Sequence, residues 1–260
     1  MFSLEFLKNV DHRLIHWGSM VLAIVTIYLL YLLLPDKLSV VLLDLNRENR
    51  ELGRFPYSVQ NAMWISLYFA LVELLIRRIA ADTESSQLTR GYLPEEFETV
   101  LQASDLPAIY RELRGNPDLN RCFLPRLIDR CILQFQASKS IDQAASLLNT
   151  SVEMFLHEVD LNYNLIRYVC WLIPSLGFIG TVVGIGEALA YAGANAQADD
   201  LLGHTTGQLA VSFHGTFLAL LMASILVFLQ NRVQSKEEHA LNLGAQYCLD
   251  NLINRLYVAK

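Results

Sequence analysis

Four long apolar stretches are the strongest pattern in the chain. Each is long enough to cross about 30 Å of hydrocarbon as a helix, which takes about 20 residues. Glu73 in the second stretch and Glu187 near the end of the third are their only charged side chains. The stretches cover residues 17–34, 57–76, 168–192 and 205–231. This pattern predicts an all-α integral membrane protein with four transmembrane helices.

The polar segments between the stretches predict the orientation of the chain. Residues 77–163 begin with two arginines and contain several more, whereas residues 193–204 carry two aspartates and neither lysine nor arginine. By the positive-inside rule, this difference places 77–163 and both termini in the cytoplasm. The predicted membrane spans are 17–34, 57–76, 164–192 and 205–231. The predicted cytoplasmic segments are 1–16, 77–163 and 232–260, and the predicted outer loops are 35–56 and 193–204.

The loop 35–56 departs from this rule, since the orientation places it outside although it contains four basic residues. Four acidic residues match them, and the preceding apolar run SVVLLDL predicts an amphipathic piece lying on the membrane surface.

Several cytoplasmic helices are expected. Pro94 followed by glutamates is typical of a helix start, and we expect helices at 95–103, 106–113 and 119–136. From Ser140 onward, apolar residues recur every three or four positions with no proline or glycine before the third stretch. This predicts one helix from about 140 to about 190, roughly 75 Å long. Residues 232–260 should extend the fourth membrane helix, with Leu241, Cys248, Leu249, Leu252 and Leu256 on their apolar side.

Small and weakly polar residues form a stripe along each of the last two membrane helices. These residues permit close helix packing, and a threonine hydroxyl can bond its own helix backbone. Two such stripes can also line one cavity, where hydroxyls relay protons through water. Both interpretations stay open from the residues alone. The stripes contain Pro174, Gly177, Thr181, Gly184 and Ala188, with Gly180 beside them, and Ser212, Thr216, Ala219 and Ala223.

A titrating group is missing from the middle of both helices. Neither has an Asp or Glu there, and Glu187 lies late in its helix. Glu73 is one turn from Arg77, which favours a paired interfacial carboxylate over a pore role. His214 titrates near neutrality but lies about 200° around the helix from the stripe, which favours an inter-helix hydrogen bond over proton transport.

Composition narrows the function classes. The 260-residue chain is 53% hydrophobic and 18% charged, and its net charge of −6 comes with no dense basic patch, which argues against nucleic acid as a partner. The four cysteines lack metal-ligand spacing, so we expect free thiols, no metal and no cofactor. An enzyme is not expected, because we find no Ser/His/Asp set or phosphate loop.

Two motifs resemble the pore helices of one family. IPSLGFIGTVVGI, residues 173–185, resembles the third-span signature of the MotA/TolQ/ExbB proton-channel family, nearest to its ExbB and TolQ branch. GTFLALLMA, residues 215–223, resembles the fourth span of MotA, as does the layout of four spans with a large cytoplasmic segment. The ExbB and TolQ branch commonly has three spans and a Glu in its final pore helix, and this chain has neither.

The resemblance implies an assembly in the bacterial inner membrane. A homopentamer of the channel subunit would surround two copies of a single-span partner resembling MotB, ExbD or TolR, whose helix supplies an Asp. By similarity, Thr181 and Thr216 would face that Asp, with Ser212 as a secondary candidate. Pro174 would be the bend that couples protonation to movement. Gly177, Gly180, Gly184, Ala219 and Ala223 would form the thin packing walls.

The implied function is that of a channel subunit in a stator that converts proton flow into mechanical, most simply rotary, work. A sodium-driven version stays open, because hydroxyls and backbone carbonyls also coordinate Na⁺. The alternative is a non-conducting membrane scaffold whose long helices recruit cytoplasmic proteins. A rotor or effector surface at Arg90, Glu95, Glu96 and Glu98 is less favoured than a solvated face, and the driven machine is not indicated.

Overall fold

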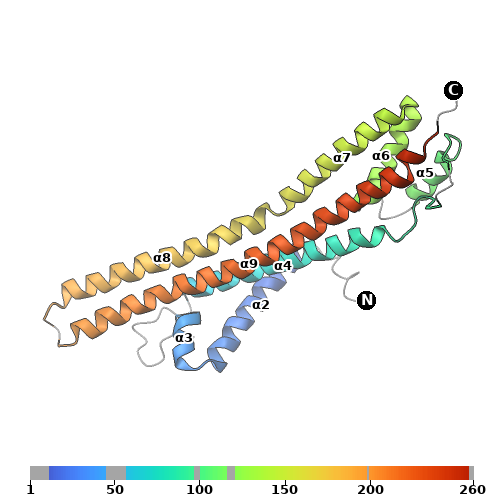
Figure 1. Cartoon of the computed structure of the whole chain (residues 1–260). Coiled ribbons are helices and arrows are strands. Elements are labelled where there is room, and N and C mark those ends of the chain that lie inside the picture. The colour runs from blue at the N-terminus through green and yellow to red at the C-terminus, as the bar shows by residue number, and fades with distance from the viewer. Residues whose placement is uncertain (1–11, 45–56, 97–99, 116–120, 198, 258–260) are drawn as a thin grey trace. The chain divides into compact units, whose positions relative to one another are not determined.

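The computed structural model describes residues 12–44, 57–96, 100–115, 121–197 and 199–257 (Figure 1). Within these ranges the regular structure is helical apart from an isolated bridge between Leu101 and Leu256. The expected all-helical fold class is confirmed. The chain divides into two compact units, which we call the first unit (Met1–Leu75 with Leu165–Gln230) and the second unit (Ile76–Asn164 with Asn231–Lys260).

The first unit contains helices suited to a membrane. Four helical stretches of the chain are long and apolar enough to cross one, in agreement with the expected number. Large apolar side chains such as Trp17, Trp171 and Phe217 are exposed on its surface, which suits contact with hydrocarbon or with other chains. The unit comprises α2 (His12–Leu33), α3 (Asp36–Leu43), the first part of α4 (Val59–Gln87), α8 (Asn164–Ala194) and the first part of α9 (Leu201–Asn251).

Helix α3 forms where the sequence predicted an amphipathic piece. It packs against α4, because Trp64 Nε1 donates to the Leu42 carbonyl at 3.0 Å and Ser58 Oγ donates to the Leu43 carbonyl at 3.1 Å. Leu43 is fully buried. The basic residues at 47, 50 and 54 lie outside the described residues, and the surface position of this piece stays a prediction.

The second unit has an apolar core between its helices. Phe135 of α6 and Phe155 of α7 are buried, and Arg126 lies over the Phe155 ring, 4.1 Å from its centroid, while pairing with Glu158 at 3.1 Å. From α9, Leu241 and Cys248 are buried as expected, whereas Leu249 is exposed. The unit comprises the rest of α4 and α9 with α5 (Leu106–Arg114), α6 (Phe123–Ser138), α7 (Ile141–Asn162) and the 3₁₀ helix η2 (Ile253–Arg255).

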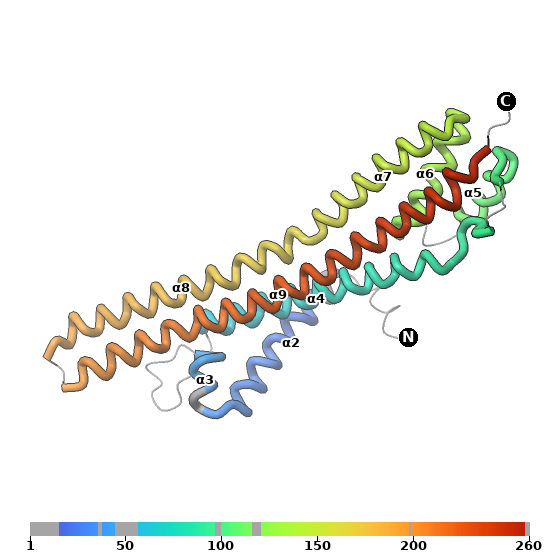
Figure 2. Tube along the Cα trace, viewed as in Figure 1, coloured from blue at the N-terminus to red at the C-terminus, as the bar shows by residue number. Residues whose placement is uncertain are grey.

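The fourth membrane helix continues beyond its span, as expected. Helix α9 runs without interruption from Leu201 to Asn251 (Figure 2). At about 1.5 Å per residue, its 51 residues extend for about 75 Å, more than twice the hydrocarbon thickness.

The prediction of one helix from 140 to 190 was wrong. Helix α7 ends at Asn162 and α8 begins at Asn164, with Tyr163 as the residue between them. Tyr163 is fully buried, and its hydroxyl donates to Glu237 at 2.9 Å. Its backbone N–H bonds the Asp160 carbonyl, three residues back, instead of four. A tertiary contact therefore coincides with the break, and proline or glycine is not needed for it.

The predicted helix at 95–103 is also absent from the described part of that range. The carbonyl groups of Pro94 and Glu95 accept hydrogen bonds from the Arg255 guanidinium, and Leu101 pairs with the chain around Leu256. These tertiary bonds occupy backbone groups in the range where the local signals predicted a helix. The helix at 106–113 is confirmed as α5, and the one expected at 119–136 begins later, at Phe123.

Candidate functional site

Helices α8 and α9 lie side by side and approach closely where the two small-residue stripes meet (Figure 1). A Cβ atom placed on Gly177 would lie 3.2 Å from the Gly215 carbonyl oxygen and would collide with the side chain of Ala219. At Gly184, an added Cβ would lie 2.9 Å from the Cβ of Ser212. The two helices therefore have room for no side chain at Gly177 or Gly184.

This close approach brings Thr181 and Thr216 together. Their Oγ1 atoms are hydrogen-bonded to each other. Thr181 Oγ1 also lies 3.1 Å from the Ser212 carbonyl and 3.2 Å from the Gly177 carbonyl, and Thr216 Oγ1 lies 3.0 Å from the Gly177 carbonyl. Thr181 is buried, whereas Thr216 is half-buried. The pair therefore has one enclosed and one more accessible member.

The threonine pair has fewer protons than acceptors. Each hydroxyl donates one proton, and the available acceptors are the other hydroxyl and the carbonyl groups of Gly177 and Ser212. Rotation of a hydroxyl can exchange one acceptor for another without backbone movement. Such a pair can hydrogen-bond a neighbouring acid and relay a proton, but it cannot hold the charge itself.

The other predicted packing residues take different places. Ala219 and Ala223 are buried, as packing between helices requires. Gly180 faces α4 instead of α9, because an added Cβ would lie 3.5 Å from Val59, an ordinary contact. Pro174 lies inside α8, where it has no N–H to donate to the Cys170 carbonyl. The helix continues through Pro174, and its role as a bend stays a prediction.

The titratable residues that the sequence offered as alternatives occupy other positions in the first unit. Glu187 is exposed, and Glu73 lies 3.7 Å from His16, a contact that becomes an ion pair when the histidine is protonated. His214 Nδ1 is buried without a hydrogen-bond partner in the part of the chain that the structure describes. This nitrogen therefore does not form the inter-helix bond that the sequence suggested.

The described residues contain no group of three or more metal-ligating side chains, and all four cysteines are free thiols. The arrangement of glycines and hydroxyls is thus the chemical feature that distinguishes the α8–α9 contact.

Comparison with protein families identifies the region that carries this contact. The model of the MotA/TolQ/ExbB proton channel family matches residues 120–243. This match supports the assignment of the chain to the MotA/TolQ/ExbB proton channel family. Members of this family act as proton channels in energy-transducing complexes together with partner proteins. The match includes all of α6, α7 and α8, and it includes both threonines. Searches of curated proteins and of solved structures gave no match.

The sequence analysis missed one polar feature next to this site. Gln60 at the start of α4 and Gln208 in α9 line a cavity with Ser212 and Gly184. Two glutamines inside otherwise apolar stretches were the available signal, because an amide in a membrane helix needs a polar partner.

Proposed function

We propose that this chain is the channel subunit of a stator powered by the proton-motive force. It conducts protons together with a single-span partner that supplies an Asp, and the complex converts the flow into rotary work. Five copies of the chain surround two copies of the partner in the bacterial inner membrane, with both termini in the cytoplasm. The family match supports the channel function, and the subunit numbers come from the resemblance to the family.

The observation that carries the proposal is the hydrogen-bonded pair of Thr181 and Thr216 behind a glycine-lined wall. The chain has hydroxyl groups at this depth but no Asp or Glu in the middle of either helix. A proton pathway needs a group that titrates, so the carboxyl group comes from a second protein. Thr216 has the more accessible hydroxyl of the pair, so it is the threonine that contacts the partner's carboxyl group first.

The energy scale suits such a mechanism. A proton-motive force of about 150 mV is worth about 3.5 kcal/mol per proton. A net hydrogen bond contributes about 1 kcal/mol. Each proton that passes can therefore break and re-form the bonds between the threonine pair and the partner's carboxyl group, which is what a cyclic motor requires.

Proton flux through reconstituted complexes tests the proposal. In liposomes that contain the chain with its single-span partner, Thr181→Val and Thr216→Val should each lower the flux at least about fivefold. That factor corresponds to the loss of one hydrogen bond of about 1 kcal/mol in the conducting state. A pH-sensitive dye inside the liposomes, with an imposed potential, gives the rate.

The matched control is Thr26→Val. Thr26 is a half-buried residue of α2, and its hydroxyl donates to its own helix, at the Leu22 carbonyl. This variant should conduct like the unmodified complex. Undiminished flux in both variants of the threonine pair would remove the pore assignment. Absence of flux from the unmodified complex would favour the alternative, a non-conducting scaffold.

A further inference from the structure

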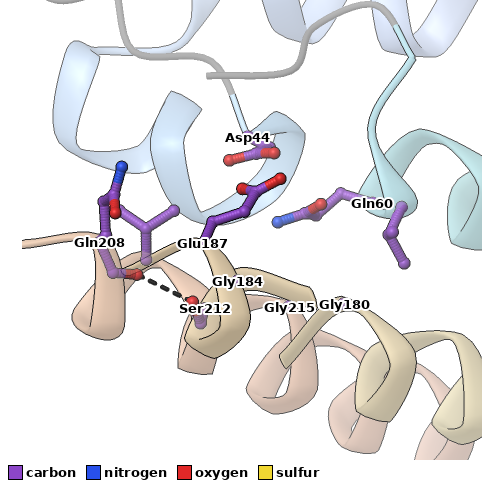
Figure 3. Close-up of a pocket in the computed structure, with 10 residues that line it drawn as sticks. Asp44, Gln60, Gly180, Gly184, Glu187, Gln208, Ser212 and Gly215 are labelled. Carbon is purple, nitrogen blue, oxygen red and sulfur yellow. Dashed lines mark hydrogen bonds between the residues drawn. The ribbon is translucent and has the colours of Figure 1, made fainter. Parts of the chain in front are cut away.

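A small polar cavity lies within the first unit. Its volume is about 90 Å³, and its walls come from α4, α8 and α9 together with Asp44 at the end of α3 (Figure 3). A site needs about 10–15 Å³ of such volume to hold one water molecule. The cavity therefore has room for several waters, provided that its polar groups can bind them.

Those polar groups are present and need partners. Gln60 is only 5% exposed, and it lines the cavity. Figure 3 shows this amide pointing towards the carboxyl groups of Glu187 and Asp44. The Oε1 atom of Gln208 is also buried and has no partner in the described part of the chain. A buried amide oxygen without a hydrogen bond is costly, so water is the natural ligand of Gln208, and the Gln60 amide lines the same cavity.

The two carboxyl groups add negative charge to the same space. Glu187 and Asp44 both line the cavity (Figure 3). A carboxylate can accept about four hydrogen bonds, so each can bind water in the cavity while it keeps other contacts. Negative charge beside water favours an excess proton over an anion, which suits a cation pathway.

Ser212 connects the cavity with the threonine pair. Its side chain lines the cavity, and its Oγ donates to the Gln208 carbonyl at 2.8 Å. Its own carbonyl accepts from Thr181 Oγ1 at 3.1 Å. Gly184 leaves this part of the wall thin, since a Cβ there would collide with the Ser212 hydroxyl. The cavity lining also includes Gly180 and Gly215, the residues directly before Thr181 and Thr216 in the chain.

We propose that this cavity is a hydrated proton inlet built into each copy of the chain. Water held by Gln60, Gln208 and Ser212 delivers protons to Thr181 and Thr216 from the end of the spans at which α8 and α9 are connected. This inference rests on the proposed channel function, and it adds an entry route through the subunit itself.

Access of a small cation to the cavity tests the inlet without measuring transport. In the complex in membranes, Gln208→Cys and Gln60→Cys are exposed to Ag⁺ and then denatured and alkylated. Mass spectrometry of each peptide then reports the cysteines that Ag⁺ protected, so the four native cysteines give separate signals. Leu226→Cys is the control, since Leu226 is a fully buried residue of α9 that does not line the cavity.

An inlet predicts that Ag⁺ protects the cysteines at 208 and 60 at least about tenfold faster than the one at 226. Equal rates at the three positions would show a dry cavity and overturn the proposal.

Proton flux provides the second measurement. Gln208→Leu keeps the approximate size of the side chain but removes its amide, and it should lower the flux at least about fivefold. Gln208→Asn restores an amide and should recover more than half of the flux. Normal flux in Gln208→Leu, with flux still lost in Thr181→Val, would overturn the inlet but leave the channel function intact. Silver access without flux in any complex would instead contradict the channel function, and the cavity would then be hydrated without delivering protons.

Discussion

At the scale of single residues, Gly177 sets how closely α8 and α9 approach. The Gly215 carbonyl and Ala219 occupy the space that a Cβ would need. The hydrogen bond between Thr181 and Thr216 depends on that spacing, because hydroxyls on neighbouring helices reach each other only when the backbones are close. The glycine stripe and the threonine pair are therefore parts of one structural device.

This dependence makes Gly177→Ala a specific prediction. The added methyl group should push the helices apart and cost about 1–3 kcal/mol, the usual range for overpacking. We expect a lower melting temperature of the purified complex in detergent and a loss of proton flux.

Gly186→Ala is the matched control for that variant. Gly186 lies in the same helix. Apart from its chain neighbours and the backbone of its own helix, an added Cβ would have no atom within 4 Å. This variant should leave the melting temperature unchanged or raise it slightly, because alanine favours helix more than glycine does. If the two variants melt alike, Gly177 is not the closest contact between the helices.

At the scale of helices, Tyr163 joins the end of α7 to α9. The hydroxyl of Tyr163 donates to Glu237 at 2.9 Å, and both residues are buried. Burial raises the pKa of Glu237, and the bond from Tyr163 and the nearby charge of Arg77 act in the opposite direction. Both residues belong to the second unit, beyond the predicted limits of the spans.

Tyr163→Phe should therefore destabilise the second unit. The variant keeps the buried ring but removes a donor from a buried carboxyl group, which typically costs about 1–3 kcal/mol. Thermal melting of the complex gives the change. Tyr257→Phe removes an exposed hydroxyl as the control. Equal melting of the two variants would mean that the bond between Tyr163 and Glu237 contributes nothing to stability.

The buried carboxyl group of Glu84 should make the stability of the folded protein depend on pH. Glu84 follows the second predicted span on α4 and accepts the Phe123 backbone N–H at 2.9 Å. Burial raises the pKa of Glu84 from 4.5 to about 7, helped by the charge of Glu237 and opposed by the Phe123 bond and Arg126. Between these values the folded state holds a proton that the unfolded state releases. Stability should therefore fall as pH rises from about 4.5 to about 7, by about 3 kcal/mol from this group.

The comparison with Glu84→Gln isolates that effect. Glutamine cannot ionise, so melting temperatures recorded between pH 5 and pH 8 should fall less steeply for this variant than for the unmodified protein. Glu112→Gln, which changes an exposed residue of α5, should follow the unmodified curve. Parallel curves for all three proteins would show that Glu84 does not carry the pH dependence.

The helices differ in how far the sequence could predict them. Local patterns were sufficient for α5 and for the continuous α9, since periodicity and apolar length decide both. The Pro94 carbonyl bonds Arg255, about 160 residues away, and Tyr163, between α7 and α8, bonds Glu237. A local pattern contains no information about partners so distant in the chain.

The same limit applies to the candidate site. Helical spacing predicted that Thr181 and Thr216 each lie on a small-residue stripe. The direct bond between them depends on how far one helix is shifted along the other, which spacing within a helix does not determine. The cavity at Gln60 and Gln208 was missed for the same reason, because it needs three helices in register.

At the scale of the whole molecule, the chain has an apolar surface that lipid or other protein must cover. Large apolar side chains remain exposed on the membrane-compatible helices, including Phe213 and Phe228 of α9. Hydrocarbon or further protein must cover them. The match to the MotA/TolQ/ExbB family supports the proposal that other copies of the chain and a partner helix cover part of this surface.

The central claim is that this chain forms the wall of an ion pathway and takes its titrating acid from a second protein. An electron cryo-microscopy reconstruction of the chain purified with its partner tests it most directly. The account predicts five copies of the chain around two foreign helices, with Thr216 of the chain facing an Asp on one of them. A reconstruction in which the threonine pair faces lipid or dry protein, with no foreign helix on the axis, would contradict it.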